Sequence, residues 1–412
     1  MRAYGQVQEM LHAGCDVRVI TSSEQGFDKN DNFQHFREHS IFYKGKKTFS
    51  KISNAHNKKS FLQNYLSLAK SFLIRSLPKS ALRTFILISN IVNRYEEFPG
   101  WSRTIISEYS DDLEGWKPEV IFSSYSPIDS HIAASRISKE LNVPWVAEYR
   151  DCWSFNTMGF SENQNDLLSR LLRKKEKNIL QECKLILAAT PFIKSYYEDF
   201  YNKNVELLLG GWEEEGDYND LQLQKANDKI EILHLGSMLH GTRSLSPILS
   251  LLENFPDLGK KYSFSFVGRD TELFQNKVNN SNSKMSFTLT NQVSFKKAEQ
   301  LGFAADILLI LMKESEMERY TLTGKLFEYI KFQKPIICFD PYQSEVSNFI
   351  ESFDMGYVVR SIDELASLLQ SKLSPNDFLR ISDENREKFS RSHQISGLLE
   401  NLSFVIRDFD NY

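Results

Sequence analysis

The segment spanning residues 321–338, TLTGKLFEYIKFQKPIIC, places a glycine, a lysine and a glutamate where they could bind a phosphate and a sugar. Its pattern predicts a short helix that opens on Gly324 and Lys325 and is followed by a strand. The first helical turn offers free backbone N–H groups and a positive dipole end, and Lys325 adds an ammonium, so this point suits a phosphate. Glu328 lies one turn later on the same face, where its carboxylate can accept hydrogen bonds from sugar hydroxyls. The combination indicates a site for a nucleotide diphosphate with its ribose.

The residues before this segment indicate where in a fold the site would lie. Residues 305–311, ADILLIL, form a nearly continuous apolar run, which is typical of a parallel strand covered on both faces. In doubly wound α/β folds, ligands bind at the carboxyl ends of such strands. We therefore expect Lys325 and Glu328 at the carboxyl edge of a parallel sheet.

Another predicted strand ends in a second candidate phosphate contact. Residues 232–237, ILHLGS, end in a small-residue turn at Gly236 and Ser237, and Arg243 comes just before the next predicted helix. A glycine lets the backbone approach a diphosphate, and a guanidinium can hold it with two hydrogen bonds. This pattern is a weak signal alone and gains weight beside the helix described above. Gly268 ends the next strand, where it either meets the base or forms a plain tight turn.

Two predicted strand ends in the first half of the chain carry polar side chains. Residues 145–153, WVAEYRDCW, bring Arg150 and Asp151 to the carboxyl end of a strand, where α/β enzymes place reactive groups. Asp151 could orient or deprotonate an acceptor hydroxyl, and the alternative is a structural ion pair with Arg150 that braces the turn. The small polar side chains of the SSYSP run at 123–127, which includes Ser124, could line an acceptor pocket.

The alternation of predicted helices and strands indicates an α/β protein with two doubly wound, Rossmann-like domains that face a cleft. At 412 residues the chain exceeds the usual size for one hydrophobic core. We expect a first domain at residues 1–209, a nucleotide-binding domain at 210–390, and a helix at 391–412 that returns to the first domain.

The start of the chain is unusual for such a fold. A doubly wound domain normally begins with a strand and a glycine-rich turn before its first helix, whereas this chain opens on MRAYG and a predicted helix. Either the sequence begins within the domain, or the domain lacks its first strand. In the first case the lost turn would be part of the active cleft.

Composition excludes several classes of protein. A net charge of −4 and a pI near 6.1 argue against a nucleic-acid binder. The four cysteines show no CxxC spacing and the eight histidines no metal-ligand spacing, so we expect neither a disulfide framework nor a metal site. No GxSxG, HExxH or Walker pattern is present. Without a signal peptide or an apolar run long enough for a membrane span, a cytoplasmic location is expected.

One basic stretch departs from this average composition. Residues 40–95 hold eleven lysines and arginines and no acidic residue, with apolar residues between them at helical spacing. A basic, aromatic-rich amphipathic segment can lie on an anionic membrane surface. The alternative is a helical hairpin that packs on its own domain and leaves its lysines solvated.

Taken together, these segments resemble the retaining, two-domain (GT-B) glycosyltransferases of family 4. The similarity spans nearly the whole chain and is carried by four islands in the family's order. They are KPEVIFSSYSPIDSHIAASRISKELNVPWVAEYRDCW (117–153), ILAATPFIKSYY (186–197), ILHLGSMLHGTRSLSPIL (232–249), and ADILLILM with TGKLFEYIKFQKPII (305–312 and 323–337).

The resemblance implies roles for the candidate residues. Arg243 and Lys325 would bind the donor diphosphate, and Glu328 the ribose. The remaining donor contacts would come from Gly236, Ser237, Gly268 and Gly324, whereas Ser124, Arg150 and Asp151 would lie on the acceptor side. Asp151, Arg243 and Lys325 are the catalytic candidates, and no metal or cofactor beyond the sugar nucleotide is implied.

One departure concerns the donor sugar. Many family members hold a second glutamate eight residues before the one matched by Glu328, and this chain has Tyr320 there. The nearby Glu314, Glu316 and Glu318 are out of register. The contact between that carboxylate and the donor sugar is therefore not expected to form in the usual way.

The sequence thus predicts a hexosyltransferase-type enzyme that moves a sugar from a nucleotide diphosphate sugar to a hydroxyl with retention. A saccharide or lipid-linked saccharide acceptor, in surface polysaccharide or glycan assembly at the inner face of the membrane, would fit the basic stretch. Two alternatives remain open. One is a nucleotide-sugar epimerase of the same two-domain build, and the other is a non-catalytic relative that binds sugar nucleotides.

Overall fold

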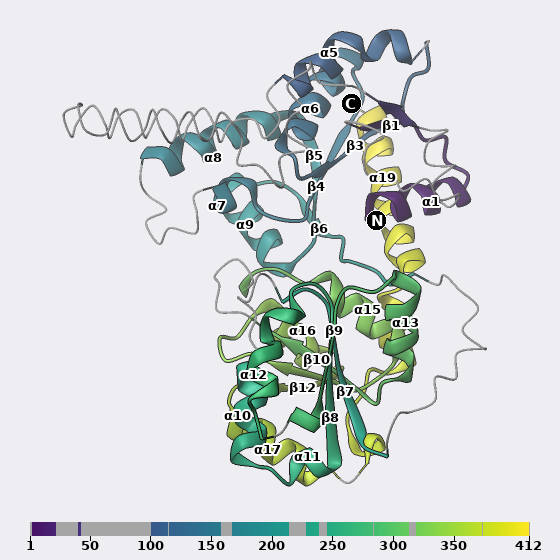
Figure 1. Cartoon of the computed structure of the whole chain (residues 1–412). Helices are drawn as coiled ribbons and strands as arrows, with labels where there is room; N and C mark the ends of the chain where they lie inside the picture. Colours follow the sequence, from purple (N-terminus) through teal and green to yellow (C-terminus); the bar gives the residue numbers. More distant parts are fainter. Residues whose placement is uncertain are drawn as a thin grey trace, which may run out of the picture. The chain divides into compact units, whose positions relative to one another are not determined.

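The computed structural model divides the chain into two compact α/β units (Figure 1). The first unit comprises Met1–Ala189, Ile193–Leu208 and Gly397–Tyr412, and the second comprises Thr190–Phe192 and Leu209–Ser396. The residues that the structure describes are 2–21, 40–42, 100–113, 115–157, 167–213, 228–238, 245–282, 284–312, 319–372 and 374–411. Apart from Ser40–Phe42, the basic stretch at 40–95 lies outside them, as does Arg243.

The second unit is built on a six-stranded, all-parallel sheet with the order β12-β11-β10-β7-β8-β9. Numbered within the unit, this is the 3-2-1-4-5-6 order of the dinucleotide-binding Rossmann fold. The order reverses between β7 and β10, so the carboxyl ends of these two strands mark the switch point where such folds bind ligands. The strands are β7 (Ile230–Leu235), β8 (Tyr262–Val267), β9 (Phe287–Thr290), β10 (Ile307–Leu311), β11 (Ile336–Phe339) and β12 (Gly356–Val359).

Helices cover both faces of this sheet, which explains its apolar strands. Successive residues of β10 point to opposite faces. Ile307, Leu309 and Leu311 join one core with α10 and α17, whereas Leu308 and Ile310 join another with α15 and α16. Figure 1 shows α10 and α17 on one side of the sheet and α13 and α15 on the other. The helices are α10 (Ser246–Asn254), α11 (Leu258–Lys261), α12 (Gln275–Asn279), α13 (Phe295–Ala304), α15 (Gly324–Phe332), α16 (Glu345–Ser352), α17 (Ile362–Ser371) and α18 (Asp383–Lys388), with short 3₁₀ turns η4 (Thr271–Phe274), η5 (Lys284–Ser286) and η6 (Pro375–Asp377).

The first unit contains a four-stranded parallel sheet with the order β3-β4-β5-β6 and a separate parallel pair, β1-β2. Its strands are β1 (Val19–Thr21), β2 (Ser40–Phe42), β3 (Ile121–Tyr125), β4 (Trp145–Tyr149), β5 (Cys183–Ala188) and β6 (Val205–Leu207). Its helices are α1 (Arg2–His12), α5 (Trp101–Asp112), α6 (Ile128–Leu141), α7 (Trp153–Thr157), α8 (Leu167–Ile179) and α9 (Pro191–Tyr201), with the 3₁₀ turn η3 (Leu180–Glu182). A buried hydrogen bond of 3.0 Å from Gln6 Nε2 to Glu148 Oε1 ties α1 to β4.

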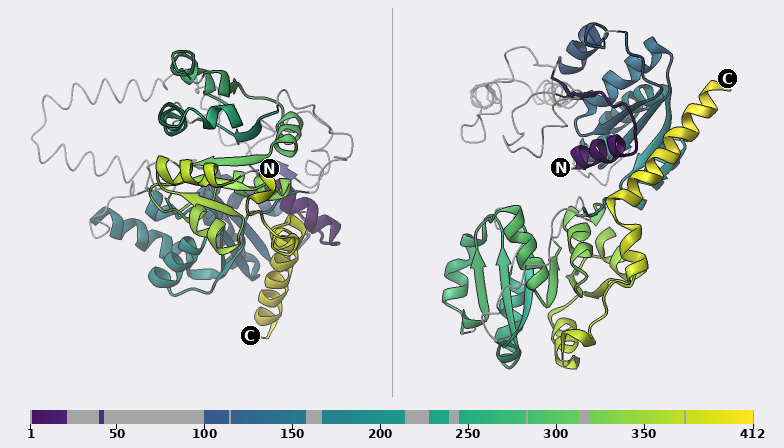
Figure 2. Two further views of the ribbon diagram at one scale, coloured as in Figure 1. Left: turned by 90° about the horizontal axis from the view of Figure 1, so that it is seen from below. Right: turned by 90° about the vertical axis from the view of Figure 1, so that its right-hand side faces the viewer.

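The last helix, α19 (Arg391–Asp410), begins in the second unit and belongs to the first from Gly397 onward (Figure 2). Its start is fixed by Trp212, whose backbone N–H donates to Phe389 O and whose carbonyl accepts from Arg391 N. The Arg386 guanidinium lies 4.0 Å from the centre of the Trp212 ring. Glu213 forms an ion pair of 2.7 Å with Arg391. These contacts hold the segment at Trp212 and Glu213, through which the chain enters the second unit, against the start of α19, through which it leaves.

The structure confirms the α/β class and the parallel sheets, and it differs from the expectations in detail. The short strands β6, β9 and β12 have at most one buried residue each, so their sequences lack the buried apolar run that indicates β10. Among the described residues, no helix is both long and apolar enough to cross a bilayer.

A buried ion pair between Glu299 of α13 and Lys331 of α15 allows a test of this packing. Their side chains are 11% and 6% exposed. Replacing Glu299 by alanine should destabilise the second unit by about 3–5 kcal/mol, because the Lys331 ammonium stays buried without this carboxylate. Replacing both residues by apolar ones, Glu299→Leu with Lys331→Met, should recover most of the loss. Urea unfolding followed by circular dichroism measures both variants, and a double variant as unstable as the single one would contradict the prediction.

Candidate donor and acceptor sites

The amino terminus of α15 is open to a ligand. The helix begins at Gly324 after Thr323, whose side chain makes no capping hydrogen bond. Apart from its chain neighbours and the backbone of its own helix, no described atom lies within 4 Å of the place where a side chain on Gly324 would begin. Gly324 is exposed, so an anion could approach the positive end of the helix dipole here.

Lys325 extends across the end of β7. A Cβ atom built on Gly236 would lie 2.0 Å from Lys325 Cε and 2.3 Å from Nζ, so the lysine occupies the space that a side chain at Gly236 would need. Gly236 also has a φ of +133°, in the region that favours glycine. The structure thus brings together two predicted site residues that are far apart in the sequence.

The end of β8 fits against the same turn. Gly236 N donates to Val267 O at 2.7 Å. Gly268 has a φ of +154°, and a Cβ atom on it would lie 2.1 Å from Gly236 O. The backbones of both strand ends therefore lie too close for side chains, and Gly268 forms a tight turn against Gly236. Ser237 follows, with its hydroxyl 3.5 Å from Asp270 Oδ2.

Glu328 lies one turn after Lys325 on the outer surface of α15 and is exposed. Although solvent reaches it, surrounding protein atoms partly desolvate the carboxyl and raise its pKa above the usual value, while the nearby Lys325 ammonium lowers it. Glu299 raises this pKa further. When ionised, a carboxylate in this position can accept hydrogen bonds from both hydroxyls of a diol.

Tyr329 is a residue of this region that the sequence analysis missed. Its side chain is fully buried, and its hydroxyl accepts a hydrogen bond from Leu235 N at 2.8 Å and donates to Leu309 O at 3.2 Å. Leu235 and Leu309 belong to β7 and β10, the strands at the switch point. Tyr329 therefore fixes α15, and Lys325 with it, against the end of β7. The sequence signal that could have identified Tyr329 is a side chain with a polar hydroxyl within the apolar face of a predicted helix.

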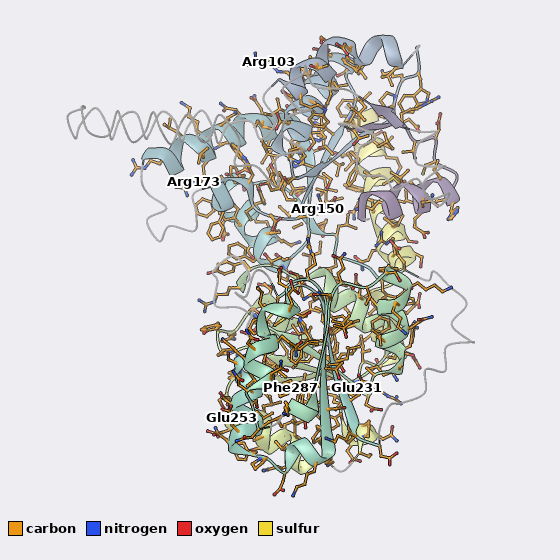
Figure 3. All side chains as sticks on the ribbon, in the orientation of Figure 1. Arg103, Arg150, Arg173, Glu231, Glu253 and Phe287 are labelled. Carbon is orange, nitrogen blue, oxygen red and sulfur yellow. The ribbon has the colours of Figure 1, made fainter. Side chains whose placement is uncertain are left out.

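In the first unit, the predicted acceptor-side residues lie at the carboxyl ends of two neighbouring strands. Tyr125 and Tyr149 are partners in the β3-β4 register. Arg150, which follows β4, donates from Nε to Tyr125 O at 2.9 Å and so links the two strand ends (Figure 3). Asp151 and Ser124 are half-buried beside this link, and Ser124 O accepts from Ser130. The side chain of Arg150 thus has a bracing role within this unit.

The expectation that the small polar residues at 123–127 line a pocket is wrong for Ser123. Its hydroxyl is buried, accepts a hydrogen bond from Trp145 Nε1 at 2.7 Å, and lies 2.8 Å from His131 Nδ1. Burial lowers the pKa of His131 to about 3, so the imidazole is neutral. Ser123 points into the core because strand residues alternate between faces and α6 covers this one.

Comparisons with known proteins identify the fold. No family model matches the chain, and no curated protein does either. A solved structure of sucrose-phosphate synthase from Thermosynechococcus elongatus matches with 14% identity over 98% of this chain and 92% of that one, at a TM-score of 0.60. The apo structure of OtsA matches with 14% identity over 74% of this chain and 77% of that one, at a TM-score of 0.52. Both are GT-B glycosyltransferases.

The chain has the GT-B fold. This confirms the resemblance drawn from the sequence at the level of architecture. In the GT-B fold of this chain, the second unit carries Gly236, Gly268, Gly324, Lys325 and Glu328 at the carboxyl edge of its sheet, and the first unit carries Ser124, Arg150 and Asp151. Arg243 lies outside the described residues.

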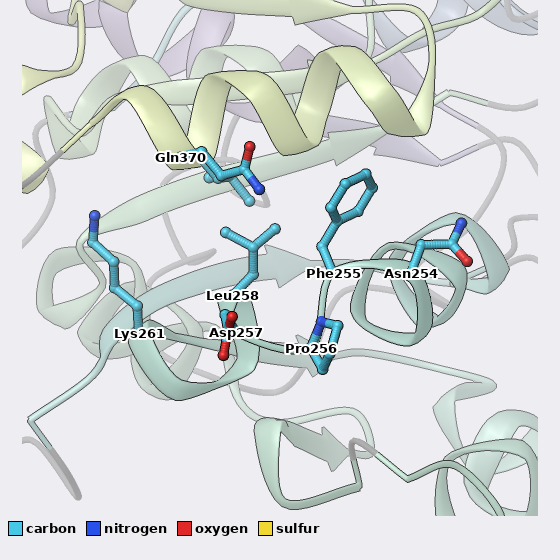
Figure 4. A pocket seen from close by; sticks show the side chains of 8 residues that line it. Asn254, Phe255, Pro256, Asp257, Leu258, Lys261 and Gln370 are labelled. Atoms are coloured by element: carbon cyan, nitrogen blue, oxygen red, sulfur yellow. The ribbon is translucent and has the colours of Figure 1, made fainter.

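A pocket of about 370 Å³ lies elsewhere on the second unit of this GT-B fold (Figure 4). Asn254, Phe255, Leu258, Lys261 and Gln370 contribute to its lining, and none of the predicted site residues does. Because α11 ends directly before β8 begins, the pocket lies at the amino ends of the strands. Doubly wound folds bind ligands at the opposite edge, so we place the site at Lys325 rather than here.

The Gly236 turn gives a testable prediction. Gly236→Ala should destabilise the second unit by about 1–3 kcal/mol, because alanine rarely adopts this backbone conformation and its Cβ would displace Lys325. Gly397→Ala is the matched control, since that glycine is helical with no described atom within 4 Å, and it should add about 0.5–1 kcal/mol of stability. Thermal or urea unfolding compares the two, and equal stabilities would contradict the described turn.

Proposed function

We propose that the protein is a glycosyltransferase that moves a sugar from a nucleotide diphosphate sugar to a hydroxyl acceptor, with retention at the anomeric carbon. The observation that carries the proposal is the Lys325 ammonium lying across Gly236, beside the open amino terminus of α15. This places a cation, a helix dipole and side-chain-free backbone at one switch point. The GT-B fold supports the same function.

The proposed chemistry follows from the leaving group. When the bond between the sugar and the diphosphate breaks, negative charge develops on the diphosphate, so preorganised cations and dipoles supply most of the stabilisation. Lys325, Arg243 and the α15 amino terminus would provide it, and Glu328 would hold the ribose. With these groups in place, we propose that the reaction needs no metal ion. In the first unit, Asp151 would orient the acceptor hydroxyl or take its proton.

The test is nucleotide diphosphate release from a panel of UDP and GDP sugars, each incubated with saccharide acceptors. Lys325→Ala should lower kcat about 10²–10³-fold, because it removes one preorganised charge at the leaving group, worth about 2.7–4 kcal/mol. Lys296→Ala, at an exposed lysine of α13, is the matched control and should leave the rate within about twofold. A Lys325→Ala variant as active as the control would refute the site.

One observation favours a second candidate, a sugar-nucleotide-binding protein without transferase activity. Tyr320 stands where the family has its second glutamate, and its ring stacks on Phe192 with centroids 4.0 Å apart and planes 20° apart. An aromatic pair cannot replace a carboxylate that accepts hydrogen bonds from a sugar. Calorimetric binding of UDP or GDP, together with no turnover on any acceptor, would favour this candidate. Turnover of the donor alone would instead indicate an epimerase.

We also propose that the acceptor lies at an anionic membrane surface as a saccharide or lipid-linked saccharide. The support is the sequence of residues 40–95, with eleven positive charges, no acidic residue and apolar residues at helical spacing. The acceptor would belong to surface polysaccharide or glycan assembly on the cytoplasmic side.

Vesicle sedimentation tests the membrane proposal. The protein should pellet with vesicles that contain about a third of an anionic lipid at low salt, and binding should fall at high salt because charge attraction is screened within a Debye length. Zwitterionic vesicles are the lipid control. A variant with Lys58, Lys59 and Lys70 changed to serine should bind more weakly, whereas the same change at Lys296 and Lys297 should not. Failure of the wild type to pellet at low salt would end this proposal.

A further inference from the structure

Glu176 of α8 is a fully buried carboxyl group in the first unit to which the proposed mechanism gives no role. Burial raises its pKa, while hydrogen bonds from surrounding hydroxyls act in the opposite direction. A buried carboxylate is costly unless such partners satisfy it, so its surroundings call for an explanation.

Hydroxyl groups from two helices, α7 and α9, gather around this carboxylate of α8. Tyr197 Oη donates to Glu176 Oε1 at 2.6 Å, and Tyr201 Oη donates to Oε2 at 2.5 Å, both from α9. Ser154 Oγ of α7 lies 3.1 Å from Tyr201 Oη and 2.8 Å from Tyr196 Oη. Glu176 accepts a hydrogen bond at each oxygen and reaches Ser154 through Tyr201, so it is the centre of this network.

The network holds both ends of one short turn. Ser154 lies in the first turn of α7, which follows the turn at residues 150–152, and Tyr149 comes just before that turn. The Tyr149 ring packs on the Tyr197 ring with centroids 4.3 Å apart. Burial is the main cause that raises the pKa of Tyr149, and the nearby Glu176 raises it further. Glu176 is therefore linked through Ser154 on one side and Tyr149 on the other to the segment that carries Arg150 and Asp151.

We infer that Glu176 is a positioning residue for the Arg150–Asp151 turn and, through it, for the acceptor. The inference rests on the proposed function for its catalytic part only. Without the carboxylate, the Tyr201 hydroxyl loses the acceptor that fixes it beside Ser154, and the support of the turn from this side is weakened. The donor site lies in the other unit and has none of these contacts, so donor binding should be insensitive to Glu176.

The first experiment measures steady-state kinetics of Glu176→Gln, which keeps the shape but removes the charge. We expect the acceptor KM to rise about tenfold, with the donor KM and the affinity for UDP or GDP changed less than twofold. Tyr201→Phe should act in the same direction. Tyr109→Phe is its matched control, because Tyr109 also donates to a carboxylate in this unit, Glu140 at 2.8 Å, but on α5 and α6. Equal effects of both tyrosine variants would overturn the inference.

The second experiment does not depend on activity. Hydrogen exchange followed by mass spectrometry should show faster exchange in peptides covering residues 149–157 of Glu176→Gln, with residues 230–238 and 319–332 unchanged. Unchanged exchange at 149–157, or faster exchange throughout the first unit, would overturn the positioning role. If the wild type shows no turnover on any donor, the proposed function fails, whereas the exchange result still decides the role of Glu176.

Discussion

The contact between the Lys325 side chain and the backbone at Gly236 is the constraint on which the rest of the second unit depends. A lysine can cross the end of β7 only because position 236 has no side chain. The neighbouring strand end can approach only because position 268 has none either. Tyr329 then fixes the height of α15 above both strands by bonding to β7 and β10. The close approach of Lys325 and of the two strand ends thus requires glycine at both 236 and 268.

The sequence predicted the parts of this arrangement that arise from local patterns. The apolar runs at β7 and β10 indicated buried parallel strands, and the Gly324–Lys325 pair indicated the start of α15. The GT-B fold followed from four ordered segments and is confirmed by the comparisons. The binding roles of the site residues stay predictions.

What the sequence could not predict comes from contacts between distant residues. Tyr329 bonds to Leu235, which is 94 positions away, and no local pattern marks that partner. Ser123 and Ser124 look alike in the sequence, yet one hydroxyl is buried against His131 because helix α6 covers that face of β3. Glu176 appeared as one charge within a basic helix, and only the packing of α9 on α8 shows that it is buried among tyrosines.

Helix α19 contributes to the structure of both units. Its first turn is clamped to Trp212 and Glu213, and its remainder, from Gly397, is part of the first unit. A frameshift or proteolytic cut near residue 390 would therefore remove α19 from the first unit. At the same time it would remove the contacts that hold the segment at Trp212 and Glu213 in the second unit. Deletion of α19 should thus be tolerated far less well than its position at the end of the chain suggests.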